Sequence, residues 1–150
     1  LKRELQDAIR SHKIPDNVRI ESWVPSVSAV LSHDNVRVFI SHCGVNSVYE
    51  SIAAGTPVVG IPMMAGQREM AVRVQDAGVG VALNKSTFTP EELRRAVVRV
   101  LEDNSFRRPI PALQSLFKLA GGAERAADLI EHFTTFGVSQ LVRSSQTAKQ

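Results

Sequence analysis

Residues 39–50 read FISHCGVNSVYE, an apolar strand followed at once by His, Gly, Asn and Ser and then by a helix that carries an acid. In α/β domains this order brings the carboxyl end of a strand to a helix N-terminus, where unpaired backbone N–H groups and the helix dipole favour an anion. Gly44 lets the backbone approach a ligand closely, and Asn46 and Ser47 are capping residues with side-chain donors to spare. The stretch therefore predicts a site for a nucleotide phosphate.

Glu50 extends this predicted site. It lies about one helical turn beyond Asn46, so its carboxylate can project from the same end of the helix. A carboxylate there suits ribose hydroxyls, as the acidic residue of a dinucleotide-binding fold does. An acid on an exposed helix is usually just solvated, and its spacing from the turn is what favours a binding role here.

Length and composition indicate one domain. The chain has 150 residues, 43% of them hydrophobic, which is enough for one core and too few for two large domains. We expect residues 1–136 to form a binding domain and residues 137–150, rich in Ser, Gln, Thr and Lys, to form a flexible tail. The formal charge is +3, but the basic residues are scattered and aromatics are 5%, which argues against a nucleic-acid partner.

Cysteine usage and hydropathy bear on the compartment. The single cysteine, Cys43, rules out an internal disulfide and is typical of a reducing compartment, so we expect a cytoplasmic location. No apolar run approaches the roughly 18 residues of a membrane-spanning helix, and no signal peptide is visible. Because the sequence begins at Leu1 and not at Met, we expect a fragment or a processed product.

Strand and helix patterns alternate along the chain. Strands are predicted at residues 18–22, 36–41, 58–61 and 80–83, and helices at residues 1–13, 27–33, 46–54, 67–77 and 90–101 and within 106–131. Short strand–helix–strand units require a parallel sheet with right-handed crossovers. We therefore expect an α/β domain, Rossmann-like, with helices on both faces of the sheet.

Three of the predicted strand ends carry unusual residues. They read Trp-Val-Pro-Ser after residue 22, His-Cys-Gly-Val-Asn-Ser after residue 41, and Pro-Met-Met-Ala-Gly-Gln after residue 61. Ligands of parallel sheets bind beyond the carboxyl ends of the strands. The coincidence of three such loops supports a binding site better than any one of them does.

Taken together, these motifs resemble the donor-binding signature of UDP-dependent glycosyltransferases, two-domain enzymes of the GT-B fold that glycosylate small lipophilic molecules. The signature comprises Trp23-x-Pro25, Leu31-x-His33, residues 39–50, Gly55-x-Pro57, Pro62 and Gln67. The resemblance is dense from Trp23 to Gln67, and the helical pattern up to about Phe136 is similar to the rest of that domain. It implies the C-terminal half of a GT-B enzyme, truncated at its N-terminal side.

The resemblance implies a uridine end of the site. Trp23 would stack its indole on uracil, and the Val24 backbone would hydrogen-bond the uracil edge. Glu50 would accept hydrogen bonds from the ribose hydroxyls. Ser26 stands where the family usually has Gln and has the shorter side chain.

The resemblance places the diphosphate and the sugar at the next two loops. The diphosphate would be surrounded by His42, Gly44, Asn46 and Ser47. Gln67 would bind hydroxyls of the sugar, and the residue before it is usually acidic, whereas here it is Gly66. This departure removes a carboxylate from the sugar end, and we do not assign Glu69, in the next turn, in its place.

The activity implied by the resemblance is transfer of a sugar, with inversion, from a UDP-sugar to a hydroxyl of a small lipophilic acceptor. UDP-glucose is the expected donor, with no metal and no cofactor. The base would be a histidine of an N-terminal acceptor domain, in the same enzyme or on a partner chain. No residue of this chain is therefore assigned as catalytic, and the chain alone is expected to be inactive.

Two other functions stay open. The chain could be a non-catalytic donor-binding subunit that docks on a separate acceptor chain. It could also belong to a UDP-sugar epimerase of the same fold, which would need further carboxylates near the sugar; Gly66 argues against this. Plain structural roles compete as well, with Trp23 as a packing residue and Asn46 and Ser47 as helix caps. Cys43 could be a nucleophile, but no second Cys or paired base is indicated, so we expect it to be a buried packing residue.

Overall fold

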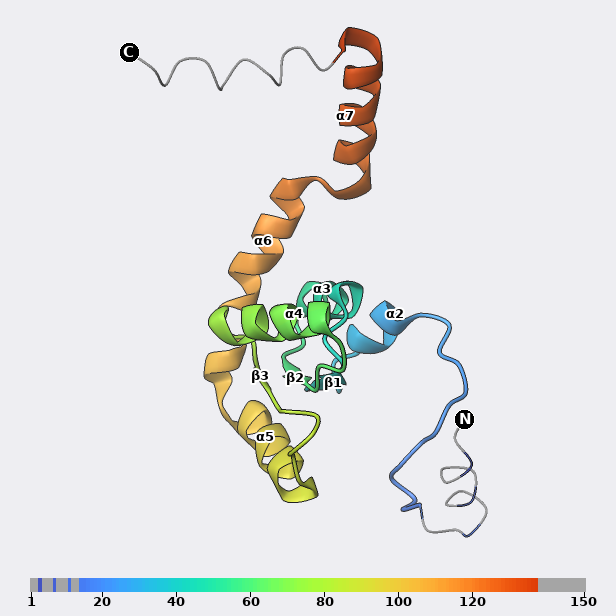
Figure 1. Cartoon of the computed structure of the whole chain (residues 1–150), viewed down its shortest axis with the longest axis vertical. Coiled ribbons are helices and arrows are strands. Elements are labelled where there is room, and N and C mark those ends of the chain that lie inside the picture. The colour runs from blue at the N-terminus through green and yellow to red at the C-terminus, as the bar shows by residue number, and fades with distance from the viewer. Residues whose placement is uncertain (1–2, 4–6, 8–10, 12–13, 138–150) are drawn as a thin grey trace.

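The computed structural model describes residues 3, 7, 11 and 14–137 of the chain. It consists of a small sheet with helices packed on it, from which two further helices extend as an arm (Figure 1). The helix predicted over residues 1–13 and the tail predicted from residue 137 fall almost entirely outside the described residues.

A parallel sheet forms the centre of the structure. Its strands, in order across the sheet, are β1 (Phe39–Ser41), β2 (Val58–Gly60) and β3 (Gly80–Ala82). The register places Val59 of the central strand beside Ile40 on one side and Val81 on the other. The predicted α/β class and the parallel direction of these strands are confirmed.

The helices lie in the predicted places, with bounds that differ by a few residues. They are α2 (Val27–Leu31), α3 (Val45–Ala53), α4 (Ala65–Asp76), α5 (Pro90–Glu102), α6 (Ile110–Ala120) and α7 (Gly122–Phe136), with a 3-10 turn η1 (Asn104–Phe106) after α5.

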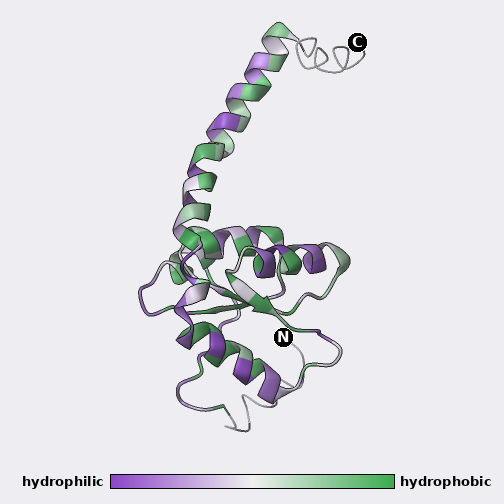
Figure 2. Ribbon diagram, turned by 90° about the vertical axis from the view of Figure 1, so that its left-hand side faces the viewer, coloured by the Kyte–Doolittle hydropathy of each residue, from purple (hydrophilic) through white to green (hydrophobic). Residues whose placement is uncertain are grey.

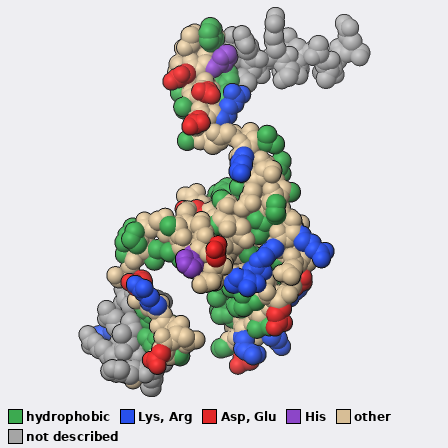
Figure 3. All heavy atoms as spheres, turned by 180° about the vertical axis from the view of Figure 1, so that it is seen from behind, with side chains coloured by type: hydrophobic (Ala, Val, Ile, Leu, Met, Phe, Trp, Pro, Cys, Tyr) green, Lys and Arg blue, Asp and Glu red, His purple; other side chains and the backbone are tan. Residues whose placement is uncertain are grey.

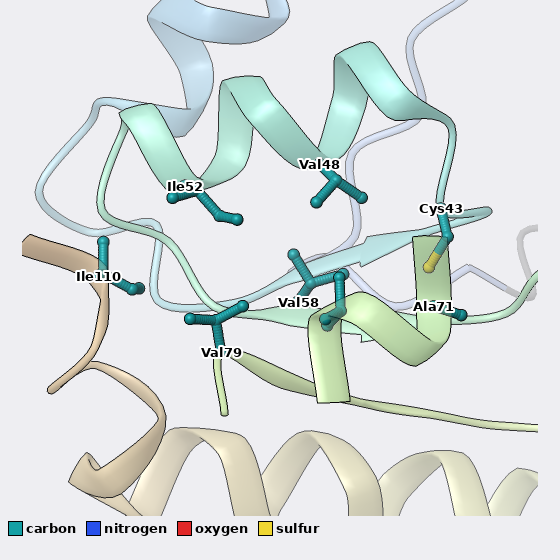
Figure 4. Close-up of a cluster of buried hydrophobic side chains, with 8 residues drawn as sticks. Cys43, Val48, Ile52, Val58, Ala71, Val79 and Ile110 are labelled. Carbon is teal, nitrogen blue, oxygen red and sulfur yellow. The ribbon is translucent and has the colours of Figure 1, made fainter. Parts of the chain in front are cut away.

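Helices cover both faces of the sheet because consecutive residues of a strand point to opposite sides. Val58 of β2 packs in one apolar cluster with Val48 and Ile52, which point from α3 toward the strands (Figure 4). Val59 points the other way and packs with Val100 of α5. Both valines of β2 are fully buried, as expected for a strand with helices on either side.

Side-chain and glycine caps set several of the helix ends. Thr89 Oγ1 accepts from the Glu92 N–H at 3.2 Å, and the Glu92 carboxylate accepts from the Thr89 N–H at 2.9 Å, a reciprocal box that begins α5. Ser26 Oγ accepts from the Ala29 N–H at 3.1 Å and begins α2. Gly121, with φ 77°, ends α6 and separates it from α7.

The strand predicted over residues 18–22 is wrong. In the described structure no strand lies beside this segment, so its backbone has no ladder to join. Instead the Val18 N–H donates to the Pro15 carbonyl at 2.9 Å, and Arg19 pairs with Glu21 inside the segment. Alternating residues form a strand only where a neighbour supplies hydrogen bonds. The same rule shortens the strand predicted from residue 36, because pairing begins at residue 39.

The arm of α6 and α7 is fixed to the domain at its base. Gln114 of α6 donates to the carbonyls of Ile52 and Ala53 at 3.1 and 2.8 Å, and so binds the C-terminal end of α3. Beyond this point the two helices continue away from the sheet (Figure 2), and no residue of α7 is buried. None of the described helices combines the length and the apolar character that crossing a bilayer requires.

We expect Gly80→Ala to lower the free energy of unfolding by about 2–3 kcal/mol, the upper part of the usual cost of overpacking. A Cβ at this position would lie 2.0 Å from the Val58 carbonyl oxygen, which is backbone and part of the β2–β3 ladder. Urea unfolding followed by circular dichroism measures the change. The control is Gly66→Ala, whose Cβ meets nothing within 4 Å; equal stability of the two variants would contradict the prediction.

Candidate functional site

The loops that follow β1 and β2 meet at one edge of the sheet. The strands are parallel, so their carboxyl ends lie side by side, and the Ile61 N–H donates to the Ser41 carbonyl at 2.7 Å just beyond them. The edge thus carries the loop before α3 and the loop before α4, two of the three loops predicted to converge. The third, around Trp23, does not follow a strand.

The start of α3 has the character predicted for an anion site, although its cap differs. The N-cap is Gly44, so Asn46 and Ser47 are the second and third helical residues, and their predicted role as caps is wrong. Gly44, with φ −63° and ψ 141°, already turns the chain into the helix at that point. No side chain of the described residues caps this end, and its first turn holds no acid. The first N–H groups are therefore open to an anion.

His42 lies against the start of the helix. A Cβ on Gly44 would be 2.6 Å from His42 Nε2, so the imidazole occupies the space that any larger residue would fill. The glycine was predicted to admit a ligand, and the neighbour that it admits in this structure is the imidazole. The His42 side chain is exposed. It can therefore donate to a group bound at the helix end.

Cys43 anchors this turn in the core. Its φ of 62° is uncommon for a residue with a side chain, and the residue is fully buried. Its N–H donates to Ser41 Oγ at 3.1 Å, and its thiol fills the space above Gly60, where a Cβ would lie 2.4 Å from Sγ. Burial raises the pKa of the Cys43 thiol, which makes it a poor nucleophile and confirms the packing role.

Glu50 lies on α3, partly exposed, in the turn after the uncapped N-terminal end of the helix. Across the described part of the chain its carboxylate has no hydrogen bond and no ion pair, so it is available to a ligand. The helix that carries it is held by Tyr49, whose ring meets Phe117 of α6 edge to face at 5.0 Å. The predicted contact of Glu50 with ribose stays a prediction.

Gly66 and Gln67 fall in the first turn of α4, which begins at Ala65, two residues earlier than predicted. Gln67 Oε1 accepts from the N–H groups of Met63 and Met64 at 2.8 and 3.0 Å, so the side chain organises the start of the helix. Gly66 is exposed and has open space around it. Contact of either residue with a sugar stays a prediction.

Glu69 does not take the place of the missing acid. Its carboxylate accepts from Arg73 Nη2 at 2.7 Å, an ion pair directed along α4 away from the N-terminal turn. This hydrogen bond, with the attraction of the two charges, raises the pKa of the Arg73 guanidinium. Helix α4 therefore places no free carboxylate beside its N-terminal turn.

Trp23, Val24 and Ser26 lie in the segment before α2. The indole is 78% exposed, which overturns the alternative that Trp23 is a packing residue and leaves its face open. Trp23 makes no ring contact with another described residue. The Ser26 hydroxyl accepts the capping bond of α2, so its predicted contact with the nucleotide would have to share that oxygen.

Sequence reasoning missed one residue at this edge, Lys85. Its ammonium donates to the Met63 carbonyl at 2.6 Å, across 22 positions of sequence. The signal that could have found it is its place just after β3, because that strand also delivers its carboxyl end to this edge.

Comparison with known proteins identifies the family to which this chain is similar. Residues 6–120 match the family model for UDP-glucoronosyl and UDP-glucosyl transferase. A 2-hydroxyacylsphingosine 1-beta-galactosyltransferase of Rattus norvegicus is 37% identical over 103 residues, covering 69% of this chain and 19% of that protein. UDP-glucuronosyltransferase 1A9 of Homo sapiens is 37% identical over 109 residues, which cover 73% of this chain and 20% of that protein.

Solved structures that are similar to this chain include further glycosyltransferases. The glycotransferase of kitacinnamycin has a TM-score of 0.74 and 34% identity, covering 81% of this chain and 31% of that one. Os79 from O. sativa in complex with UDP has a TM-score of 0.54 and 35% identity, covering 58% of this chain and 21% of that one. The chain thus spans about a fifth of the length of the curated relatives it matches.

The buried thiol predicts a pH dependence of stability. Because burial raises the pKa of Cys43 above its ordinary value of 9.0, the folded protein holds this proton more tightly than the unfolded chain. That contribution is fully present below pH 9.0 and is lost as pH rises through the folded pKa. Urea unfolding between neutral and strongly alkaline pH should show a steeper loss of stability for the wild-type chain than for Cys43→Ala. Equal slopes would contradict the prediction.

Proposed function

Because the chain belongs to the UDP-glucuronosyl and UDP-glucosyl transferase family, we propose that it binds the UDP-sugar donor of a glycosyltransferase. The observation that carries this proposal is the open start of α3, with His42 laid against it and no acid in its first turn. Such an end attracts a diphosphate through its N–H groups and its dipole. The related Os79, solved in complex with UDP, supports this choice of ligand.

In this proposal the rest of the nucleotide is held by the predicted residues around that helix end. Trp23 offers its exposed ring to uracil, assisted by the Val24 backbone and the Ser26 region, and Glu50 accepts from the ribose hydroxyls. Gly66 and Gln67, at the start of α4, face the sugar. Because β1 and β2 place the two helix starts at one edge, phosphate and sugar contacts are neighbours.

The proposed chemistry is transfer with inversion to a hydroxyl of a small lipophilic acceptor. The acceptor oxygen gives its proton to a base, attacks the anomeric carbon, and the bond from that carbon to the UDP oxygen breaks. The part of this chain is to stabilise the negative charge that develops on UDP, through the α3 N–H groups and His42. We propose that no metal or cofactor is needed for this step.

The base and the acceptor surface belong, in this proposal, to another region of the same enzyme, and the chain alone is inactive. The support is that the matched segment is about a fifth of a single longer chain in the curated relatives. We propose UDP-glucose as the donor and the cytoplasm as the compartment. Lys and Arg side chains stand in separate groups among acidic and apolar ones on the face in Figure 3, which supports the proposal that nucleic acid is not a partner.

Isothermal titration with UDP tests the proposal directly. We expect the wild-type chain to bind UDP in preference to dTDP. Glu50→Ala should weaken UDP binding by about 1–3 kcal/mol, because hydrogen bonds from the ribose hydroxyls to a carboxylate are lost. The matched control is Glu124→Ala, which removes a carboxylate from the first turn of α7, in the arm and not on α3. Absence of UDP binding would refute the proposed function, and unchanged affinity of Glu50→Ala would remove this residue from the site.

An acidic residue at position 66 should raise the affinity for the sugar part of the donor and not for UDP. Gly66→Asp fits the open space at this position and would place a carboxylate within reach of sugar hydroxyls. We expect it to raise affinity for UDP-glucose by about 1 kcal/mol without raising affinity for UDP, which carries no sugar. Titration of both ligands against Gly66→Asp, with Gly66→Ala as the control for the change in helix propensity, measures this. Equal gains for both ligands would show that the position does not face the sugar.

A further inference from the structure

The loop between β2 and α4 spans residues 61–64, and its second half is held by polar contacts and not by apolar packing. The side chains of Met63 and Met64 are 47% and 67% exposed, so neither anchors the loop in the core. A groove of about 450 Å³ lies between α4 and residues 82–86, and Pro62 and Lys85 are among the residues that line it. The loop therefore has open space beside it into which it could shift.

Gln67 holds this loop from the side of the helix. Its side-chain oxygen accepts from the Met63 N–H at 2.8 Å and from the Met64 N–H at 3.0 Å. A carboxamide accepts only through its oxygen, and two bonds use both lone pairs. What remains for a ligand is the NH₂ group. Gln67 can therefore offer donors to a sugar but no acceptor.

Lys85 holds the same loop from the other side. Its ammonium reaches from the turn after β3 to the Met63 carbonyl at 2.6 Å. Met63 is thus bonded at its N–H by Gln67 and at its carbonyl by Lys85. An ammonium on a carbonyl is a charge-assisted hydrogen bond, stronger than a neutral one.

We propose that Lys85 is a positioning residue for the sugar end of the donor site, an inference that rests on the proposed function. By fixing Met63, it fixes the backbone N–H that orients the Gln67 side chain. The NH₂ group of Gln67 is thereby aimed at one place beyond the loop, where it can donate to a sugar oxygen. Lys85 acts through Met63 and Gln67 and does not itself touch the ligand.

Titration of UDP and UDP-glucose against Lys85→Met tests this role. We expect affinity for UDP-glucose to fall about three- to tenfold, and affinity for UDP to change less than about twofold, because the uridine and phosphate contacts lie on other elements. Lys85→Arg should restore most of the loss, since a guanidinium can also donate to the carbonyl. Lys118→Met, on α6, removes the same charge away from the loop and controls for attraction of the anionic ligand. An equal loss for both ligands, or no loss, overturns the proposal.

Amide hydrogen exchange of the free chain measures how firmly the loop is held when no ligand is bound. In Lys85→Met the amides of Met63 and Met64 should exchange at least about tenfold faster, while those of β2 stay protected. Unchanged exchange at these two amides would overturn the positioning role even if nucleotide affinities changed. If the wild-type chain bound no UDP, the proposed function would fall and the ligand role of Lys85 with it. If it bound UDP and the variant kept the wild-type preference for UDP-glucose, only the role of Lys85 would fall.

Discussion

The parallel pairing of β1 with β2 is the constraint on which the site depends. Three ladder positions, from Phe39 with Val58 to Ser41 with Gly60, fix two strand ends beside each other. The pairing holds because Val58 and Val59 are buried on opposite faces, each against its own helix layer. A shift by one residue would exchange these faces. The core therefore sets where the start of α3 and the loop before α4 meet.

The contact between Cys43 and Gly60 links the buried core to the turn before α3. The thiol fills the space that the missing side chain of Gly60 leaves, and the residue keeps a positive φ that few side chains adopt. A buried contact thus sets the direction in which the chain leaves β1. The N–H groups at the start of α3 therefore follow a turn that is anchored in the core, as the proposed binding of a phosphate would require.

The helices could be predicted because their capping signals are local in sequence. The extent of the strands and the contact of Lys85 could not, because they depend on residues elsewhere in the chain. Thr89 with Glu92, and Ser26, carry their capping signals within three residues, so α5 and α2 begin where the sequence indicates. Residues 18–22 alternate like a strand, yet strand formation depends on a neighbour that lies elsewhere in the chain. The bond of Lys85 to Met63 spans 22 positions and has no local pattern, so the family resemblance could point to Gln67 but not to the residue that holds its loop.

The two ends of the proposed site differ in how they are built. The phosphate end stands on buried residues such as Cys43 and Val48, and altering it would cost core packing. The proposed sugar end stands on a loop held by hydrogen bonds to Met63 and Met64, whose side chains are exposed and leave the core packing unaffected. If the proposed site is correct, substitutions in this loop would change the contacts with the sugar without disturbing the sheet. Relatives of about equal identity to this chain are named as a galactosyltransferase and as a glucuronosyltransferase, a difference in sugar that such a division allows.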